Sequence, residues 1–216
     1  MAFPKTRQSA ILGLHDGDAT VRHRSMETVA SAYWEPVCKY LRLRWHESYE
    51  DAADLTQAFF SKSIESATLI RYEPSKGTFR TYLRSCLDHF VLNARKTRNP
   101  TVPLDFDFAS QQESPEELFH REWLRSLFTS AVEDLRARRG DLRFRVFERY
   151  DLNDSDSRPT YDDLAAEFGV TTASITNYLA SMRRAFRKAV LDRLRDLTLN
   201  EREFRTEVRA LFGIEV

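Results

Sequence analysis

The sequence has little of what builds disulfide-linked or metal-bound folds. Its 216 residues include two cysteines, Cys38 and Cys86, which lie far apart and not in a CxxC arrangement. This spacing argues against a disulfide framework and gives no sign of a structural zinc site. We expect both thiols to pack as small apolar side chains, and we expect no metal ion and no cofactor.

Long apolar runs are also missing. No segment has the length of a signal peptide's apolar region or of a membrane-spanning helix, which predicts a cytoplasmic protein with no membrane partner. Glycine is scarce, at six residues, and β-branched runs are few. Apolar residues instead recur every three or four positions in many segments, which predicts an all-α fold.

The chain has no net charge, since Lys+Arg and Asp+Glu both number 33. The molecule as a whole therefore does not attract nucleic acid. Charge is instead segregated by segment, because residues 71–98 are basic and residues 47–54 are acidic. Any binding to nucleic acid must use such local patches.

The common catalytic motifs are absent. There is no Walker loop, no GxGxxG, no HExxH and no GxSxG, and the histidines are scattered. Cys86 and His89 lie three residues apart on one predicted helix face, but no second pair completes a metal site. We therefore expect that the protein is not an enzyme.

The most informative stretch is residues 160–188, TYDDLAAEFGVTTASITNYLASMRRAFRK. Thr160 and Asp163 form a capping box before a short helix that Gly169 ends. Thr171 is the expected N-cap of a longer helix with apolar residues every three or four positions. This pattern is typical of a helix-turn-helix, although an ordinary αα-hairpin shows it as well.

In a helix-turn-helix, the start of the second helix reaches base edges in the major groove, while basic side chains contact phosphates. The polar residues at that start are Thr172, Ser174, Thr176 and Asn177. The cations farther along the same helix are Arg183, Arg184, Arg187 and Lys188. These side chains are the candidate DNA-binding surface.

The first half of the chain contains further helical patterns. Pro36 predicts a boundary between two helices. Ser48 and Asp51 open a helix whose inward face holds Ala52, Leu55 and Phe59. A long aromatic and basic helix follows over residues 79–98. Residues 99–113 have two prolines and no period, which predicts a linker.

In this order and spacing, the segments resemble the extracytoplasmic-function (ECF) group of bacterial RNA polymerase sigma factors. YWEPVCKYLRLR, DAADLTQAFF and GTFRTYLRSCLDHFVLNARKTR look like successive parts of sigma region 2, and YDDLAAEFGVTTASITNYLASMRRAFRK looks like region 4. The resemblance implies two small helical domains, residues 1–98 and 114–197, joined by the linker 99–113. Residues 198–216 would be a C-terminal extension helix.

The resemblance also implies what the segments do. The protein would bind core RNA polymerase and direct promoter recognition and transcription initiation. The acidic helix would dock on the β′ clamp through Asp51, Asp54 and Gln57, and the second domain would read the minus-thirty-five element of promoter DNA and touch the β flap.

By the same resemblance, the basic helix would capture and open the minus-ten element. Cations and polar groups suit this task, as do rings that stack unpaired bases. The candidate polar side chains are Arg80, Arg84, His89, Asn93, Arg95, Lys96 and Arg98. Phe79, Tyr82 and Phe90 are candidate rings, although most of them fit an apolar core as well.

The chain departs from the family pattern in two places. Thr176 and Asn177 stand where relatives commonly carry basic residues. The preferred minus-thirty-five sequence therefore cannot be inferred from the resemblance. In the docking helix, Ala53 and Ala58 occupy positions that are usually acidic, with Thr56 between them. A phosphate on Thr56 would add about −1.5 to −2 charges, which suggests control by a Ser/Thr kinase. Alternatively, Thr56 only fills a half-exposed position and has no regulatory role. An anti-sigma factor is another candidate regulator of the protein.

Two alternatives stay open. Residues 198–216 lie beyond the sigma pattern, and they either cap the core of the second domain or cover a DNA or polymerase surface until displaced. The chain as a whole is alternatively a helix-turn-helix regulator that binds duplex DNA without polymerase. That interpretation explains residues 160–188 but leaves the acidic and basic helices without a task.

Overall fold

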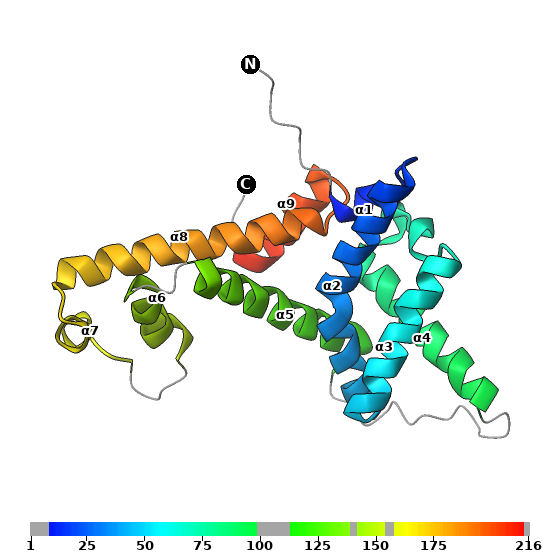
Figure 1. Cartoon of the computed structure of the whole chain (residues 1–216), viewed down its shortest axis with the longest axis horizontal. Helices are drawn as coiled ribbons and strands as arrows, with labels where there is room; N and C mark the ends of the chain where they lie inside the picture. The colour runs from blue at the N-terminus through cyan, green and yellow to red at the C-terminus, as the bar shows by residue number, and fades with distance from the viewer. Residues whose placement is uncertain (1–8, 99–112, 139–141, 154–157, 214–216) are drawn as a thin grey trace, which may run out of the picture. The chain divides into compact units, whose positions relative to one another are not determined.

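A computed structural model describes residues 9–98, 113–138, 142–153 and 158–213 (Figure 1). Within these ranges all regular secondary structure is helical, which confirms the predicted all-α fold. The predicted linker, residues 99–113, lies outside the described residues except for Glu113. In the same part of the chain, no helix combines the length and apolar character needed to cross a membrane.

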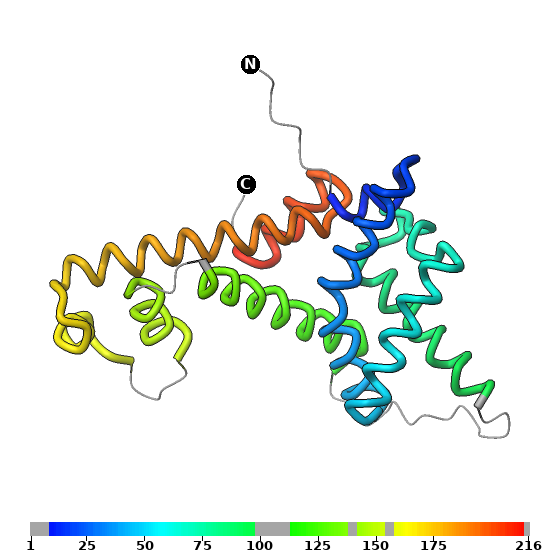
Figure 2. The backbone as a smooth tube through the Cα atoms, in the orientation of Figure 1, coloured from blue at the N-terminus to red at the C-terminus, as the bar shows by residue number. Residues whose placement is uncertain are grey.

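The helices follow one another along the chain as the trace in Figure 2 shows. They are α1 (Ala10–Gly13), α2 (Ala19–Arg44), α3 (Tyr49–Glu65), α4 (Phe79–Arg98), α5 (Pro115–Arg138), α6 (Leu142–Phe147), α7 (Tyr161–Phe168), α8 (Thr172–Asp196) and α9 (Glu201–Phe212). Two 3-10 turns, η1 (Leu69–Arg71) and η2 (Pro74–Lys76), lie before α4, and a π-helical turn, η4 (Glu148–Leu152), follows α6.

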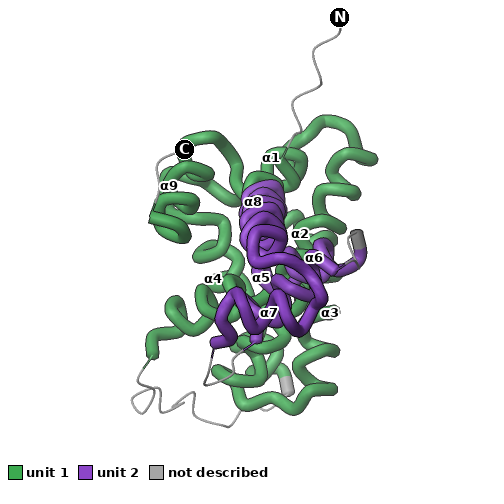
Figure 3. Tube along the Cα trace, turned by 90° about the vertical axis from the view of Figure 1, so that its left-hand side faces the viewer, with its two compact units in different colours: residues 1–126, 194–216 green, residues 127–193 purple. Residues whose placement is uncertain are grey.

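Contacts divide the chain into two compact units, coloured separately in Figure 3. Unit 1 comprises residues 1–126 and 194–216, and unit 2 comprises residues 127–193. Both α5 and α8 contribute residues to each unit. The sigma-type domains 1–98 and 114–197 stay a prediction, because a division by contacts carries no information about family.

The helix boundary predicted at Pro36 is wrong, since α2 runs through this residue without a break. Proline lacks an N–H group, so the helix loses one backbone hydrogen bond at this point. Pro36 is buried, and so are Tyr33 and Val37 on either side of it. We infer that packing of this stretch into the core outweighs the local cost of the proline.

In unit 1, Asp88 ties α4 to the end of α2. Its carboxylate accepts hydrogen bonds from the Tyr40 hydroxyl at 3.0 Å and from Trp45 Nε1 at 3.2 Å. Arg84, one turn earlier on α4, donates to the same carboxylate at 2.7 Å. A half-buried carboxylate with three donors is well satisfied, and it fixes which face of α4 turns inward.

Unit 2 contains the helix-turn-helix that the sequence predicts. Thr160 Oγ1 accepts from the Asp163 N–H at 3.1 Å, and Asp163 Oδ2 accepts from the Thr160 N–H at 2.9 Å, which confirms the capping box. Gly169 ends α7 with φ of 65°, a left-handed conformation that favours glycine. The core beneath α7 and α8 is formed by Leu135, Phe144, Val146, Phe147, Leu164, Ile175, Leu179 and Met182.

Candidate nucleic-acid interface

The start of α8 presents the polar residues expected to meet bases. Thr172, Thr176 and Asn177 are exposed, whereas Ser174 is half-buried. The Thr172 hydroxyl donates to Asp162 Oδ1 at 2.9 Å, and the Thr176 hydroxyl donates to the Thr172 carbonyl at 3.1 Å. Because both hydroxyl protons are already used in hydrogen bonds within unit 2, Thr172 and Thr176 can only accept hydrogen bonds from DNA. Asn177 is therefore the best-placed donor among these four residues.

The basic part of α8 is exposed, but its members differ in their partners. Arg183 makes two hydrogen bonds to Asp151, from Nε to Oδ2 at 2.8 Å and from Nη2 to Oδ1 at 2.9 Å. These bonds raise the pKa of Arg183 above its usual value. Lys188 pairs with Asp192 at 2.6 Å. Among the described residues, Arg184 and Arg187 have no ion pair, so they are the cations best placed for phosphates.

Sequence reasoning did not identify Asp151, which organises the turn η4 beside α8. Its carboxylate binds Arg158 at 2.9 Å as well as Arg183. Both guanidinium groups also lie over the Tyr150 ring, at 4.2 Å and 5.6 Å. Nothing local in the sequence relates Asp151 to Arg183, because the pair forms through tertiary packing.

The outward face of α3 carries the three residues expected to dock on polymerase. Asp51, Asp54 and Gln57 are exposed, while the predicted inward residues of the same helix are buried. Asp51 Oδ2 also accepts a hydrogen bond from the Ser48 hydroxyl at 2.7 Å. Asp54 is therefore the carboxylate of this face that has no capping role.

Thr56 is fully buried, so the expectation that it fills a half-exposed position is wrong. Its hydroxyl donates to the Ala52 carbonyl at 2.7 Å, and it also hydrogen-bonds the Cys38 thiol, whose pKa burial raises. The physical reason is that α3 packs against both α2 and α4, which widens its buried face. In this conformation a kinase has no access to the Thr56 hydroxyl.

The residues expected to capture the minus-ten element fall into two groups on α4. Arg80, Arg84 and Arg95 hold partners within unit 1, namely Glu207, Asp88 and the carbonyl of Trp45. His89, Asn93 and Lys96 are exposed, and their spacing of four and three residues puts them on one helix face. The Arg98 side chain lies outside the described residues.

The rings of α4 serve the core of unit 1. Phe79 is buried and packs edge-to-face on Tyr33 at 5.7 Å, so its assignment as a DNA-stacking ring is wrong. The Tyr82 hydroxyl donates to the Thr68 carbonyl at 2.7 Å, and Phe90 packs on Phe59 at 5.7 Å. The aromatic residues recur at the apolar positions of the helix, which is the pattern of a core.

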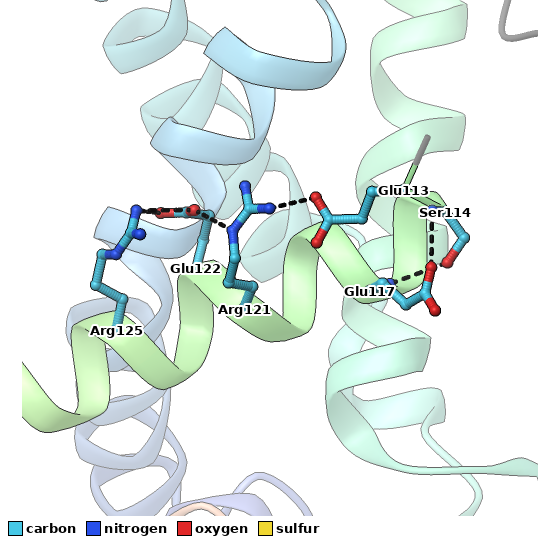
Figure 4. Close-up of polar contacts among 6 residues, drawn as sticks. All are labelled: Glu113, Ser114, Glu117, Arg121, Glu122 and Arg125. Carbon is cyan, nitrogen blue, oxygen red and sulfur yellow. Dashed lines mark hydrogen bonds and ion pairs between the residues drawn. The ribbon is translucent and has the colours of Figure 1, made fainter. Parts of the chain in front are cut away.

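A second polar cluster runs along the start of α5 (Figure 4). Glu122 is 1% exposed and accepts from Arg121 Nε at 3.0 Å and from Arg125 Nη1 at 3.2 Å. Arg121 also pairs with Glu113, and Ser114 and Glu117 form a capping box. Each of these contacts lies within or just before one helix, so we assign the cluster to the stability of α5.

Unit 2 also has an open groove of about 870 Å³. Its apolar lining includes Phe128, Val132, Phe168 and Phe186. Acidic and basic side chains from α5, α6, η4 and α7 surround this apolar strip. A mixed groove of this kind fits a peptide segment better than a charged phosphate chain.

No set of three or more histidine, cysteine, aspartate or glutamate side chains in the described ranges is arranged to hold a metal ion. Comparisons of the chain with protein-family models, curated proteins and solved structures found no match.

Proposed function

We propose that the protein is an alternative sigma factor of the extracytoplasmic-function type, which binds core RNA polymerase in the cytoplasm and directs transcription initiation. The observation that carries this proposal is the presence of two different exposed surfaces. One is the acidic outward face of α3, with Asp51, Asp54 and Gln57. The other is the helix-turn-helix, with its polar start and the exposed cations Arg184 and Arg187. A protein that binds duplex DNA alone has no use for the first surface.

The two surfaces match different partners by charge. Carboxylates on α3 suit a basic protein surface such as the β′ clamp, and they would repel DNA. Cations on α8 suit the phosphates of the minus-thirty-five element. The exposed stripe of His89, Asn93 and Lys96 on α4 suits the minus-ten element. We propose that the β flap binds in the open groove of unit 2, against its apolar strip.

Burial of Thr56 limits how a kinase would act in this proposal. Phosphorylation requires α3 to separate from its neighbours first, because the Thr56 side chain is fully buried where α3 packs on α2 and α4. Control by an anti-sigma factor needs no such opening, since the outward face of α3 is already exposed.

The test is a binding and transcription assay with the purified chain. We expect the chain to comigrate with core polymerase in gel filtration and to direct transcription from DNA selected by the complex. A helix-turn-helix regulator would instead bind duplex DNA unaided and leave core polymerase unbound. That second outcome would overturn the sigma-factor proposal.

A further inference from the structure

Helix α9, which belongs to unit 1, buries one of its acidic side chains. Phe204 and Val208 are buried, and Glu207 between them is 6% exposed. Both carboxylate oxygens of Glu207 meet the guanidinium of Arg80 on α4, at 3.2 Å and 3.3 Å. Glu203, one turn earlier, accepts a bond from the Tyr72 hydroxyl at 3.3 Å. The polar contacts of α9 therefore reach residues of the predicted first domain.

Arg80 lies on an aromatic platform from α5. Its guanidinium carbon is 4.3 Å from the centre of the Trp123 ring, and His120 stacks on that ring at 5.9 Å. Trp123 is 2% exposed, yet its Nε1 has no hydrogen-bond partner in the described chain, and neither does Nδ1 of His120. Buried polar groups are nearly always paired. The indole N–H can only donate, so it calls for an acceptor that the described residues do not supply, whereas Nδ1 of His120 donates or accepts according to its tautomer.

The chemistry of this cluster fits a phosphate group. A guanidinium binds carboxylate and phosphate oxygens with the same paired geometry. A phosphodiester offers more acceptor oxygens than a carboxylate does, and it is the group that a helix contacting DNA would meet. The indole that stacks on the guanidinium carries an N–H with no partner among the described residues, and this donor suits an additional oxygen.

The attachment of α9 is of a kind that a competing anion can replace. A buried ion pair gains little net free energy, because removing both charges from water offsets their attraction. The helix spans 12 residues, a length that is marginal for an isolated helix in water. Exchange of Glu207 for a phosphate keeps the charge of Arg80 neutralised, whereas simple release of α9 does not.

We propose that Arg80, Trp123 and His120 form a phosphate-binding site for single-stranded DNA, and that Glu207 of α9 occupies this site until DNA displaces it. The inference rests on the proposed function, since it assigns α4 to the opened promoter strand. It adds two residues of α5, Trp123 and His120, to the candidate DNA-binding residues. It also makes α9 a competitor of DNA for Arg80 within the same chain.

The first experiment compares Glu207→Gln with Glu201→Gln, which removes an exposed carboxylate from the same helix. The probe is a fluorescein-labelled single-stranded DNA of random sequence, and its anisotropy gives the affinity. We expect Glu207→Gln to bind about three- to tenfold more tightly than the wild type, with a steeper salt dependence. Glu201→Gln should show a much smaller gain.

The double variant Arg80→Gln, Glu207→Gln should lose that gain, because the site then lacks its cation. Equal affinity of Glu207→Gln and the wild type would overturn the proposal, and so would a gain that persists in the double variant. Thermal unfolding of each variant shows whether it is folded at the temperature of the assay.

A second measurement needs no variant. Hydrogen exchange of the wild-type chain should show loss of protection across α9 when the same DNA is added. Unchanged protection of α9 at saturating DNA would overturn the proposal even if Glu207→Gln failed to fold. A chain that directs transcription while α9 stays protected would contradict this inference alone, whereas a chain that never binds core polymerase would contradict the proposed function.

Discussion

Thr56 carries a buried hydroxyl, and its burial restricts the addition of a phosphate. The side chain is fully buried, and its proton is used by the Ala52 carbonyl. Threonine is small enough to fit between α3 and α2, and the hydrogen bond removes the cost of burying its oxygen. A phosphate or carboxylate at this position would place a negative charge beside the Ala52 carbonyl oxygen in a fully buried site.

We therefore predict that Thr56→Glu destabilises the fold by roughly 3–5 kcal/mol, the usual cost of an unpaired buried charge. Thr56→Ser keeps the hydroxyl and should cost roughly 1 kcal/mol through the lost methyl group. Urea unfolding followed by circular dichroism measures both values. Equal stability of Thr56→Glu and the wild type would contradict the burial and reopen the case for a phosphate switch in the folded chain.

The buried tyrosines make stability depend on alkaline pH. Burial raises the pKa of Tyr82 to about 12 and also raises the pKa values of Tyr33, Tyr40 and Tyr72. An unfolded tyrosine ionises near pH 10 (roughly). Because the unfolded state loses these protons first, the stabilisation is complete below that pH and is lost as pH rises further.

We predict that the free energy of unfolding falls between about pH 10 and about pH 12. Tyr82→Phe removes one titrating group and should make this fall shallower. Tyr49→Phe changes an exposed ring, 67% accessible, and serves as the control. Urea unfolding at a series of pH values tests this, and identical slopes for Tyr82→Phe and the wild type would speak against it.

At the scale of helices, the sequence predicts local features well. Capping residues such as Thr160 and Ser48 act within three or four residues, and the structure confirms both of them. The inward and outward faces of α3 also follow from periodicity alone. These features need no knowledge of distant parts of the chain.

Other features depend on contacts between distant segments, and they escaped prediction. The sequence does not show that α2 and α4 both close on α3, which buries Thr56. Nor does it relate Arg80 to Glu207, or Asp151 to Arg183, because each pair lies far apart in the chain. Candidate site residues are thus placed on the correct helices, but their partners come from tertiary packing.

Two exposed cations of α8, Arg184 and Arg187, have no ion pair within the described part of the chain, and they give a prediction at this scale. Arg184→Gln and Arg187→Gln should each weaken duplex DNA binding and lower the slope of log affinity against log salt by about one. Arg202→Gln removes an exposed cation from α9 and should leave both quantities nearly unchanged. Anisotropy titrations over a range of salt concentrations measure the slopes. If all three variants lose affinity equally, α8 is not the DNA-binding element.

At the scale of the whole molecule, zero net charge makes the arrangement of charge decisive. The exposed acidic face of α3 attracts basic surfaces, whereas the exposed cations of α8 attract anions. Variants of one face should therefore affect one partner and spare the other. This separation distinguishes a protein with two interfaces from a simple DNA-binding protein.

Asp54→Lys tests the acidic face, since Asp54 is exposed and has no capping role. We expect at least about a tenfold loss of affinity for core polymerase, because the new charge repels a basic surface. The free energy of unfolding and the binding of duplex DNA should stay unchanged. Glu65→Lys reverses a charge at the end of the same helix and is the matched control. Unaltered polymerase binding by Asp54→Lys would remove α3 from the interface.

The contact between Arg80 and Glu207 joins residues that are 127 positions apart. A ribosome adds about 5 to 20 residues per second, so the arginine is synthesised about 6 to 25 s before its carboxylate partner. During translation each copy therefore passes through a stage in which the α4 cation has no α9 to neutralise it. The pair between α4 and α9 therefore forms only when synthesis of the chain is almost complete.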